Sequence, residues 1–249
     1  MLRALLLFCS LYSGALAQDG LEAMRSDLAS GNYALAAQFT GPALVRDMPG
    51  DPEAHYLYSY ALYLVGSVVS AREALTQAFT LSPEPPPYYE VLNGLLLAAE
   101  GDSRGAQRAL AEAFSRTQDY DTAMAWGRVA WQGGDYETAL AAYSAAADTR
   151  QGRREVWSHL NRGRMLKTLD RPDEAITALQ QAIAVFEAND PGGDLPNPGY
   201  VEAFFRLGEV YEALGDAQQA VAYYEAARGA DPNYAPASVA LERVQRDSP

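Results

Sequence analysis

Residues 204–232 read FFRLGEVYEALGDAQQAVAYYEAARGADP, and this stretch contains the pattern that decides the fold. A glycine-aspartate pair at 215–216 divides it into two segments, as expected for a turn followed by a helix N-cap. Gly208 and Ala220 are small at the places where two antiparallel helices would have to approach closely. Pro232 closes the stretch, because proline disfavours helix in the residue before it. The stretch therefore predicts a tightly packed helical hairpin.

The same pattern returns along most of the chain. A small alanine marks each of six units, at Ala36, Ala71, Ala106, Ala139, Ala175 and Ala220, with spacings of 35, 35, 33, 36 and 45 residues. A second alanine follows seven residues later, at Ala43, Ala78, Ala113, Ala146, Ala182 and Ala227. A glycine lies twelve residues before the marker in the last four units, at Gly94, Gly127, Gly163 and Gly208. Since one hairpin cannot bury its apolar face alone, the repetition predicts a stack of hairpins.

These units resemble the tetratricopeptide repeat, a helix-turn-helix unit of 34 residues. The sixth unit matches it best, at Leu207, Gly208, Tyr211, Ala220, Tyr224, Ala227 and Pro232. The resemblance implies an all-α fold, a right-handed superhelical α-solenoid of about six repeats with a C-terminal capping helix. The repeats are expected at about 20–52, 53–85, 87–120, 121–155, 156–200 and 201–233, and the cap helix at 234–247. Met24 and Ser59 replace the small glycine in the first two units, drift that suits the terminal repeats.

The fifth repeat is longer than the others by about eleven residues. The extra residues are expected in a loop insert near 189–199, which reads NDPGGDLPNPG. Asp190 and Asp194 have the spacing of calcium ligands, but Gly192, Leu195 and Val201 occupy positions where an EF-hand loop needs a ligand, a glycine and a glutamate. We therefore predict a loop without a calcium site.

Residues 1–17 read MLRALLLFCSLYSGALA and have the layout of a secretory signal peptide. Arg3 gives a positive start, and Ala15-Leu16-Ala17 gives a small-x-small cleavage site before Gln18. An uncleaved membrane anchor is the alternative, but a span needs about 18 apolar residues and this run is about half as long. We expect cleavage after Ala17, no stable membrane insertion afterwards, and a periplasmic or secreted repeat protein of the exported bacterial type.

The composition argues against nucleic-acid binding, catalysis and metal binding. Thirty-two acidic against 19 basic residues give a net charge of -13, which would repel a nucleic-acid backbone. The one cysteine, Cys9, lies in the predicted leader, and the two histidines, His55 and His159, fall at repeat positions that face a partner helix. We therefore expect core packing for both histidines and predict no catalytic residues, no cofactor and no metal.

In repeats of this family, the first helix of each unit lines a concave groove, at about its second, fifth, ninth and twelfth positions. Mapped onto this chain, these positions hold a concentration of aromatic and basic residues, which are the types that anchor a docked protein chain. The candidate groove residues are Tyr56, Tyr60, Tyr63, Tyr88, Arg128, Trp131, Trp157, Arg164, Lys167 and Phe205. Ordinary packing within the solenoid is the other interpretation of the tyrosines.

The predicted partner is a protein or peptide. A row of tyrosines followed by cations would suit an extended peptide that carries a carboxylate. The lysine, asparagine and arginine clamp that the family uses for chaperone tails is absent, since Met124 with Arg128 and Leu160 with Arg164 occupy two of its position pairs. We therefore expect a non-catalytic scaffold of the cell envelope that binds a partner segment in its groove. The alternative is a structural subunit of an outer-membrane, secretion or pilus assembly apparatus, joined through its convex face or its insert.

Overall fold

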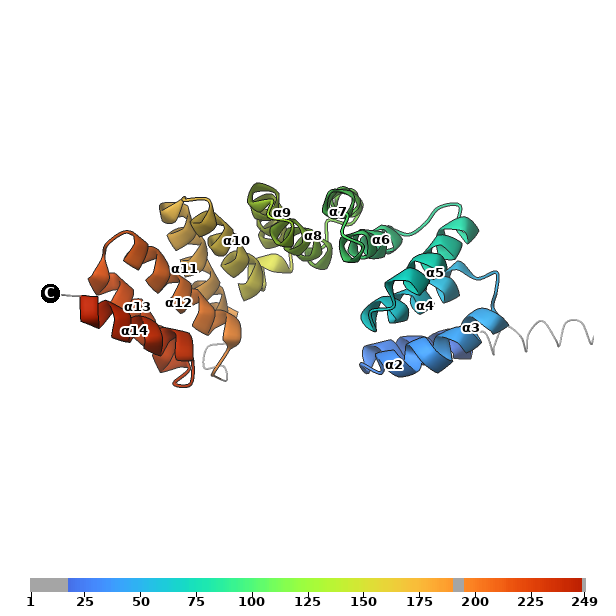
Figure 1. Ribbon diagram of the computed structural model, residues 1–249, viewed down its shortest axis with the longest axis horizontal. Helices are drawn as coiled ribbons and strands as arrows, with labels where there is room; N and C mark the ends of the chain where they lie inside the picture. The colour runs from blue at the N-terminus through green and yellow to red at the C-terminus, as the bar shows by residue number, and fades with distance from the viewer. Residues whose placement is uncertain (1–17, 190–194, 248–249) are drawn as a thin grey trace, which may run out of the picture. The chain divides into compact units, whose positions relative to one another are not determined.

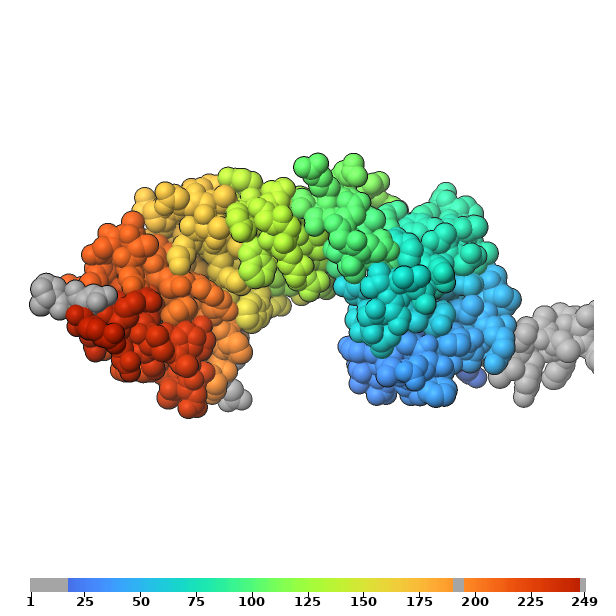
Figure 2. All heavy atoms as spheres, viewed as in Figure 1, coloured from blue at the N-terminus to red at the C-terminus, as the bar shows by residue number. Residues whose placement is uncertain are grey.

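The computed structural model describes residues 18–189 and 195–247 of the chain. All regular structure in these ranges is helical (Figure 1), which confirms the predicted all-α class and the α-solenoid of stacked helical hairpins. The chain divides into two compact units, Met1–Ala113 and Phe114–Pro249. Within each unit, side chains fill the spaces that separate the ribbons (Figure 2). No helix in the described ranges combines the length and the apolar character needed to cross a membrane.

The first unit begins with a helix that includes residues 18–29. A continuous helical stretch follows, made of α2 (Tyr33–Leu35), a π-helix (Ala36–Thr40) and α3 (Gly41–Asp47). The remaining helices are α4 (Pro52–Leu64), α5 (Val68–Leu81), α6 (Pro87–Ala99) and α7 (Ser103–Thr117), whose last residues belong to the second unit.

The second unit contains α8 (Tyr120–Gln132), α9 (Tyr136–Asp148), a short 3-10 helix (Gly152–Arg154), α10 (Val156–Thr168), α11 (Pro172–Asn189), α12 (Pro198–Ala213), α13 (Ala217–Ala230) and α14 (Ala235–Asp247). Pro172 is the first residue of α11, a position where proline is tolerated. Helix α11 ends at Asn189 and α12 begins at Pro198, so both ends of the predicted insert lie in helices. Residues 190–194, with Asp190 and Asp194, lie outside the described ranges, as does the predicted leader.

Small residues allow the close helix contacts that the sequence predicts. All six marker alanines are fully buried. Each of the four glycines faces a large residue of the second helix of its hairpin, and the contacts are Gly94 with Leu110, Gly127 with Tyr143, Gly163 with Leu179, and Gly208 with Tyr224. A Cβ atom at Gly127 would lie 2.6 Å from the ring of Tyr143, closer than atoms pack. In the second repeat Ser59 replaces the glycine, and its hydroxyl donates to the carbonyl of Ala71 at 2.7 Å.

The turns between paired helices use a left-handed residue followed by a capping residue. Five turn glycines have φ between +74° and +90°, and in the fifth repeat Asp170 adopts φ +56° instead. After the glycine, Asp135 and Asp216 cap α9 and α13 by accepting backbone N–H groups of Thr138 and Gln219. These caps confirm the expected role of the glycine-aspartate pair.

The first repeat departs from the predicted register. Its π-helix, Ala36–Thr40, contains wider i to i+5 turns, which shift the residues that follow around the helix axis. As a result Ala43 is not in the buried position that the repeat spacing predicts, and Leu44, 4% exposed, takes that place. The first repeat therefore does not bury its second alanine, as the other five repeats do.

The capping helix α14 buries one face, as predicted. Ala237, Ala240, Leu241 and Val244 are buried against neighbouring residues, while Glu242 and Arg243 are exposed. Tyr234 precedes the helix and packs against Phe205, with ring centroids 5.5 Å apart. The helix therefore covers the end of the second unit with a polar outer surface.

Candidate partner-binding site

Four of the predicted groove residues line one cavity in the second unit. The cavity has a volume of about 390 Å³ and is called the α8–α10 cavity below. Its lining residues are Asp121, Met124, Ala125, Arg128, Trp131, Tyr143, Trp157, Asn161 and Arg164. Trp131 and Trp157 are 38% and 41% exposed, so each indole keeps a large surface open to a partner.

Two arginines line this cavity together with Tyr143. Burial raises the pKa of Tyr143, and the positive charges of Arg164 and Arg128 act in the opposite direction. Arg164 also lies over the ring of Trp131, with its Cζ atom 4.8 Å from the ring centroid. Arg128 is exposed and forms no ion pair with any described residue. The cavity thus presents donors and cations beside two open aromatic surfaces.

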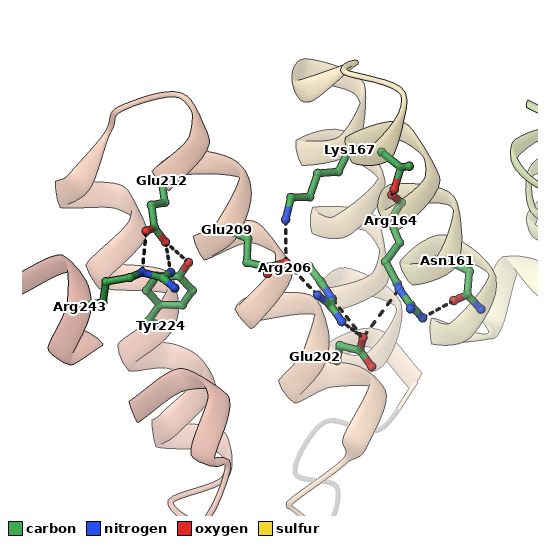
Figure 3. A network of polar contacts seen from close by, with 10 residues as sticks. Asn161, Arg164, Lys167, Glu202, Arg206, Glu209, Glu212, Tyr224 and Arg243 are labelled. Carbon is green, nitrogen blue, oxygen red and sulfur yellow. Dashed lines mark hydrogen bonds and ion pairs between the residues drawn. The ribbon is translucent and has the colours of Figure 1, made fainter. Parts of the chain in front are cut away.

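The two predicted cations of α10, Arg164 and Lys167, form ion pairs with glutamates of the next repeat (Figure 3). Lys167 Nζ lies 2.9 Å from Glu209 Oε2, and Arg164 Nε lies 3.9 Å from Glu202 Oε1. Arg206, from α12, donates to both of these glutamates at 2.9 Å. Although burial acts to raise it, hydrogen bonds from Lys167 and Arg206 hold the pKa of Glu209 below its usual range. These side chains form a network of alternating charge between α10 and α12, in which Lys167 is already neutralised.

Phe205 and the neighbouring Glu212 contact the last two helices instead of the cavity. Phe205 packs on Tyr224 with ring centroids 5.5 Å apart and is partly buried. Glu212 accepts from the hydroxyl of Tyr224 at 2.5 Å and from Arg243 of α14 at 2.6 Å (Figure 3). The sixth repeat therefore uses these positions to hold the capping helix.

The predicted tyrosines lie in the first unit and form an aromatic cluster. Tyr56 stacks on Tyr89 at 4.8 Å, lies edge-on to Tyr88 at 4.7 Å and faces Tyr60 at 6.4 Å between centroids. The hydroxyl of Tyr88 donates to Glu53 at 2.8 Å, and burial together with this bond raises the pKa of Tyr88 to about 12. Tyr63 also packs, partly buried, against the core of this unit. The rings therefore contact one another extensively.

Both histidines are buried, as expected from their repeat positions. His55 is 9% exposed, and its Nε2 lies 3.0 Å from the carbonyl of Pro49. His159 is 7% exposed, and neither ring nitrogen forms a hydrogen bond of good geometry with a described residue. Burial, helped by the charge of Arg162, lowers the pKa of His159. Among the described residues no cluster of three or more His, Cys, Asp or Glu side chains could hold a metal ion.

Sequence reasoning missed Tyr143, Asn161 and Asp121 as cavity residues. Tyr143 belongs to the second helix of its hairpin, whereas the prediction considered only first helices. The available signal was the pairing of Tyr143 with Gly127, because a glycine lets a long ring pass beneath its helix. Asn161 is one turn from Trp157 on α10, and its Oδ1 accepts from Arg164 at 3.1 Å.

Sequence profiles of the tetratricopeptide repeat family match most of the chain. One profile matches residues 21–84 and 160–235, and a second matches residues 121–188. The chain therefore belongs to the tetratricopeptide repeat family, whose members are in general non-catalytic scaffolds for protein interactions. No curated protein sequence matches the chain.

Solved structures share the fold at low sequence identity. PilW, described as a widely conserved type IV pilus biogenesis factor, superposes with a TM-score of 0.71 at 13% identity, over 91% of this chain and 98% of PilW. YrrB, described as a protein with an unusual peptide-binding site, gives 0.62 at 16% identity, over 81% and 97%. The APC/C hetero-tetramer Cut9-Hcn1 gives 0.63 at 19% identity, and this chain covers 94% of its own length but only 45% of that chain.

Proposed function

We propose that the protein is a non-catalytic scaffold of the cell envelope that binds a segment of a partner protein through the α8–α10 cavity. The observation that supports this most strongly is the meeting of Arg128, Arg164, Trp131 and Trp157 around one cavity of about 390 Å³. Exposed indoles and guanidinium groups are the side chains that most often dominate protein interfaces. The similarity to YrrB, described as having a peptide-binding site, is in keeping with a protein segment as the ligand.

A photocrosslinking amino acid in place of Trp131 tests this function in cells. Tyr136 offers a matched control position, because it is an aromatic residue of the same unit, is also 38% exposed, and does not line the cavity. We expect a discrete adduct from position 131 that is absent from position 136 and is lost when Arg128→Glu is added. Identical adducts from both positions, or adducts that persist in the Arg128→Glu variant, would show that the α8–α10 cavity does not bind the partner.

The envelope location rests on residues 1–17 alone. Their charged start, apolar stretch and small-x-small ending support export with cleavage after Ala17. N-terminal sequencing of the protein recovered from the periplasm or the medium should begin at Gln18. An intact Met1 on protein retained inside the cell would contradict export.

The second candidate function is a structural subunit of an outer-membrane, secretion or pilus apparatus. It is favoured by Leu195 of the insert, an apolar side chain that is 51% exposed. PilW, described as a pilus biogenesis factor, has a similar fold. If this function holds, Leu195→Ser should disrupt assembly of the apparatus while crosslinking from position 131 is unchanged. Normal assembly with Leu195→Ser would argue against contact through the insert.

A further inference from the structure

A second cavity adjoins the first and shares one residue with it. It has a volume of about 200 Å³ and is called the insert cavity below, because Asn197 of the insert lies in its wall. Its lining residues are Arg154, Glu155, Val156, Trp157, Val185, Phe186, Asn189 and Asn197. Trp157, the second residue of α10, lines both cavities and is 41% exposed. The Trp157 side chain is therefore a wall common to both cavities.

The α8–α10 cavity has the chemistry to bind a carboxylate. Arg128, Arg164 and the hydroxyl of Tyr143 converge there, and all three groups can donate hydrogen bonds. Glu202 contacts Arg164 only at 3.9 Å, and Arg128 has no ion-pair partner among the described residues. Asp121 also lines the cavity, and Glu202 partly offsets the charge of Arg164. Arg128, which has no ion-pair partner among the described residues, therefore supplies the charge that favours an acceptor with negative charge.

The insert cavity has an apolar floor and a polar rim. Val185 and Phe186 are 5% and 9% exposed and form the floor. On the rim, Asn189 Nδ2 donates to the carbonyl of Arg154 at 2.8 Å, and Asn197 Oδ1 accepts from the backbone N–H of Tyr200 at 3.1 Å. These contacts leave Asn189 Oδ1 as an acceptor and Asn197 Nδ2 as a donor. One acceptor and one donor at a rim match the N–H and C=O of an extended peptide.

We propose that the two cavities are consecutive subsites for one extended segment of the partner, which crosses Trp157 between them. A carboxylate-bearing residue occupies the α8–α10 cavity, and an apolar residue occupies the insert cavity. In an extended chain, residues two apart point to the same side and lie about 7 Å apart. Because both cavities border the same indole, we choose the shortest spacing that keeps two side chains on one side, the pattern acidic-x-apolar, in one of the two chain directions. This inference rests on the proposed function and adds the identity of the recognised side chains.

The insert then has a role in specificity. Of the insert, Asn189 and Asn197 line the second subsite, which has Trp157 in common with the first. The groove and the insert, which the sequence presents as alternative contact sites, are in this arrangement parts of one site.

Binding of the purified protein to a set of synthetic peptides tests the inference. Each peptide has nine residues of Ser and Gly, acetylated and amidated, with one Asp and one Val placed at separations of one to five positions in both orders. We expect the tightest binding, measured by fluorescence anisotropy, at a separation of two, and about tenfold weaker binding when Asn replaces the Asp. A parallel set with Val and a free C-terminus shows whether a terminal carboxylate serves equally well.

Two variants test the two cavities separately. Arg128→Gln should remove the preference for Asp over Asn and keep the preference for Val. Asn189→Ala, at an exposed position, removes the acceptor for a main-chain N–H at the rim of the insert cavity and should weaken binding about fivefold, with the preference for Asp over Asn unchanged. Arg108→Gln is the matched control, because Arg108 is an exposed arginine of α7 that lines neither cavity. It should change nothing.

The outcomes separate this inference from the proposed function. A preference for Asp without any dependence on separation or on Asn189 would overturn the consecutive subsites and leave the α8–α10 cavity as a binding site. A crosslinked partner segment at position 131 that lacks the acidic-x-apolar pattern would do the same. Absence of both peptide binding and crosslinks would reject the proposed function itself.

Discussion

Corresponding repeat positions have different uses in the two units of the chain. In the first unit, Tyr56 of α4 is surrounded by other rings and belongs to an aromatic cluster. In the second, Trp131 of α8 and Trp157 of α10 border a cavity and keep more than a third of their surface exposed. The comparison shows that an aromatic residue at a groove position does not by itself indicate a binding contact. Neighbouring rings cover Tyr56, whereas Tyr88 of the same cluster is 39% exposed, as much as the two indoles.

The largest expected effect comes from removing a ring of the first unit. Tyr89 is 1% exposed and stacks on Tyr56, so Tyr89→Ala should lower the free energy of unfolding by about 3 to 5 kcal/mol. Trp131→Ala should lower it by less, about 2 kcal/mol, because the indole keeps 38% of its surface exposed and so loses less burial. Urea denaturation followed by circular dichroism measures both. Equal losses would erase the distinction between a structural and an available aromatic set.

An intermediate effect on stability is expected at Gly127, which packs against Tyr143 of the cavity wall. Gly127→Ala would place a methyl group 2.6 Å from the ring of Tyr143, and overpacking of this kind costs about 1 to 3 kcal/mol. Gly229→Ala is the control, because no atom lies within 4 Å of its added Cβ and alanine favours helix. The difference in thermal midpoint between the two variants is the measurement. A Gly127→Ala protein as stable as the control would contradict the close contact.

A smaller effect is expected from the charge network of the second unit. Glu209→Gln removes the partner of Lys167 and one partner of Arg206, and should cost about 1 kcal/mol, because these side chains are partly shielded from water. Asp47→Asn, in an ion pair whose side chains are 73% and 64% exposed, should have no measurable effect. Chemical denaturation at low and high salt checks both. A loss at Asp47 that equals the loss at Glu209 would argue against the network.

The smallest effect concerns pH and His159. Burial and the charge of Arg162 lower its pKa in the folded protein, and Asp148 acts in the opposite direction. Below about pH 6.5 the unfolded chain therefore binds the proton more readily, and the free energy of unfolding should fall as the pH is lowered from 7.5 to 5.5. Above pH 7.5 the histidine should contribute no slope. His159→Gln should have a shallower pH dependence than the wild type, and parallel curves would show that His159 does not contribute.

The sequence predicts the fold well because its signals are local and repeated. The alanine and glycine spacings predict the hairpins, and the turn residues predict where helices begin. The shift that leaves Ala43 only partly buried could not be predicted, because no residue type in 36–40 indicates a π-helix. For the site, the spacing on each helix predicts Arg128 and Trp131 as neighbours of the cavity. The pairing of Lys167 with Glu209 escaped prediction, because it depends on the relative height of α10 and α12, which neither helix encodes alone.

The glycines at the close helix contacts leave room for either a leucine or a tyrosine on the second helix of the hairpin. Opposite Gly127 and Gly208 the chain has tyrosine, and opposite Gly94 and Gly163 it has leucine. Both tyrosines are buried, and each has charged side chains beside its phenol, Arg128 and Arg164 for Tyr143 and Glu212 for Tyr224. Alternate hairpins of the last four thus contain a buried hydroxyl beside a charged residue of the first helix. Moving one of these hairpins to another place in the chain would interrupt the alternation of leucine and tyrosine, whereas moving two consecutive hairpins together would preserve it.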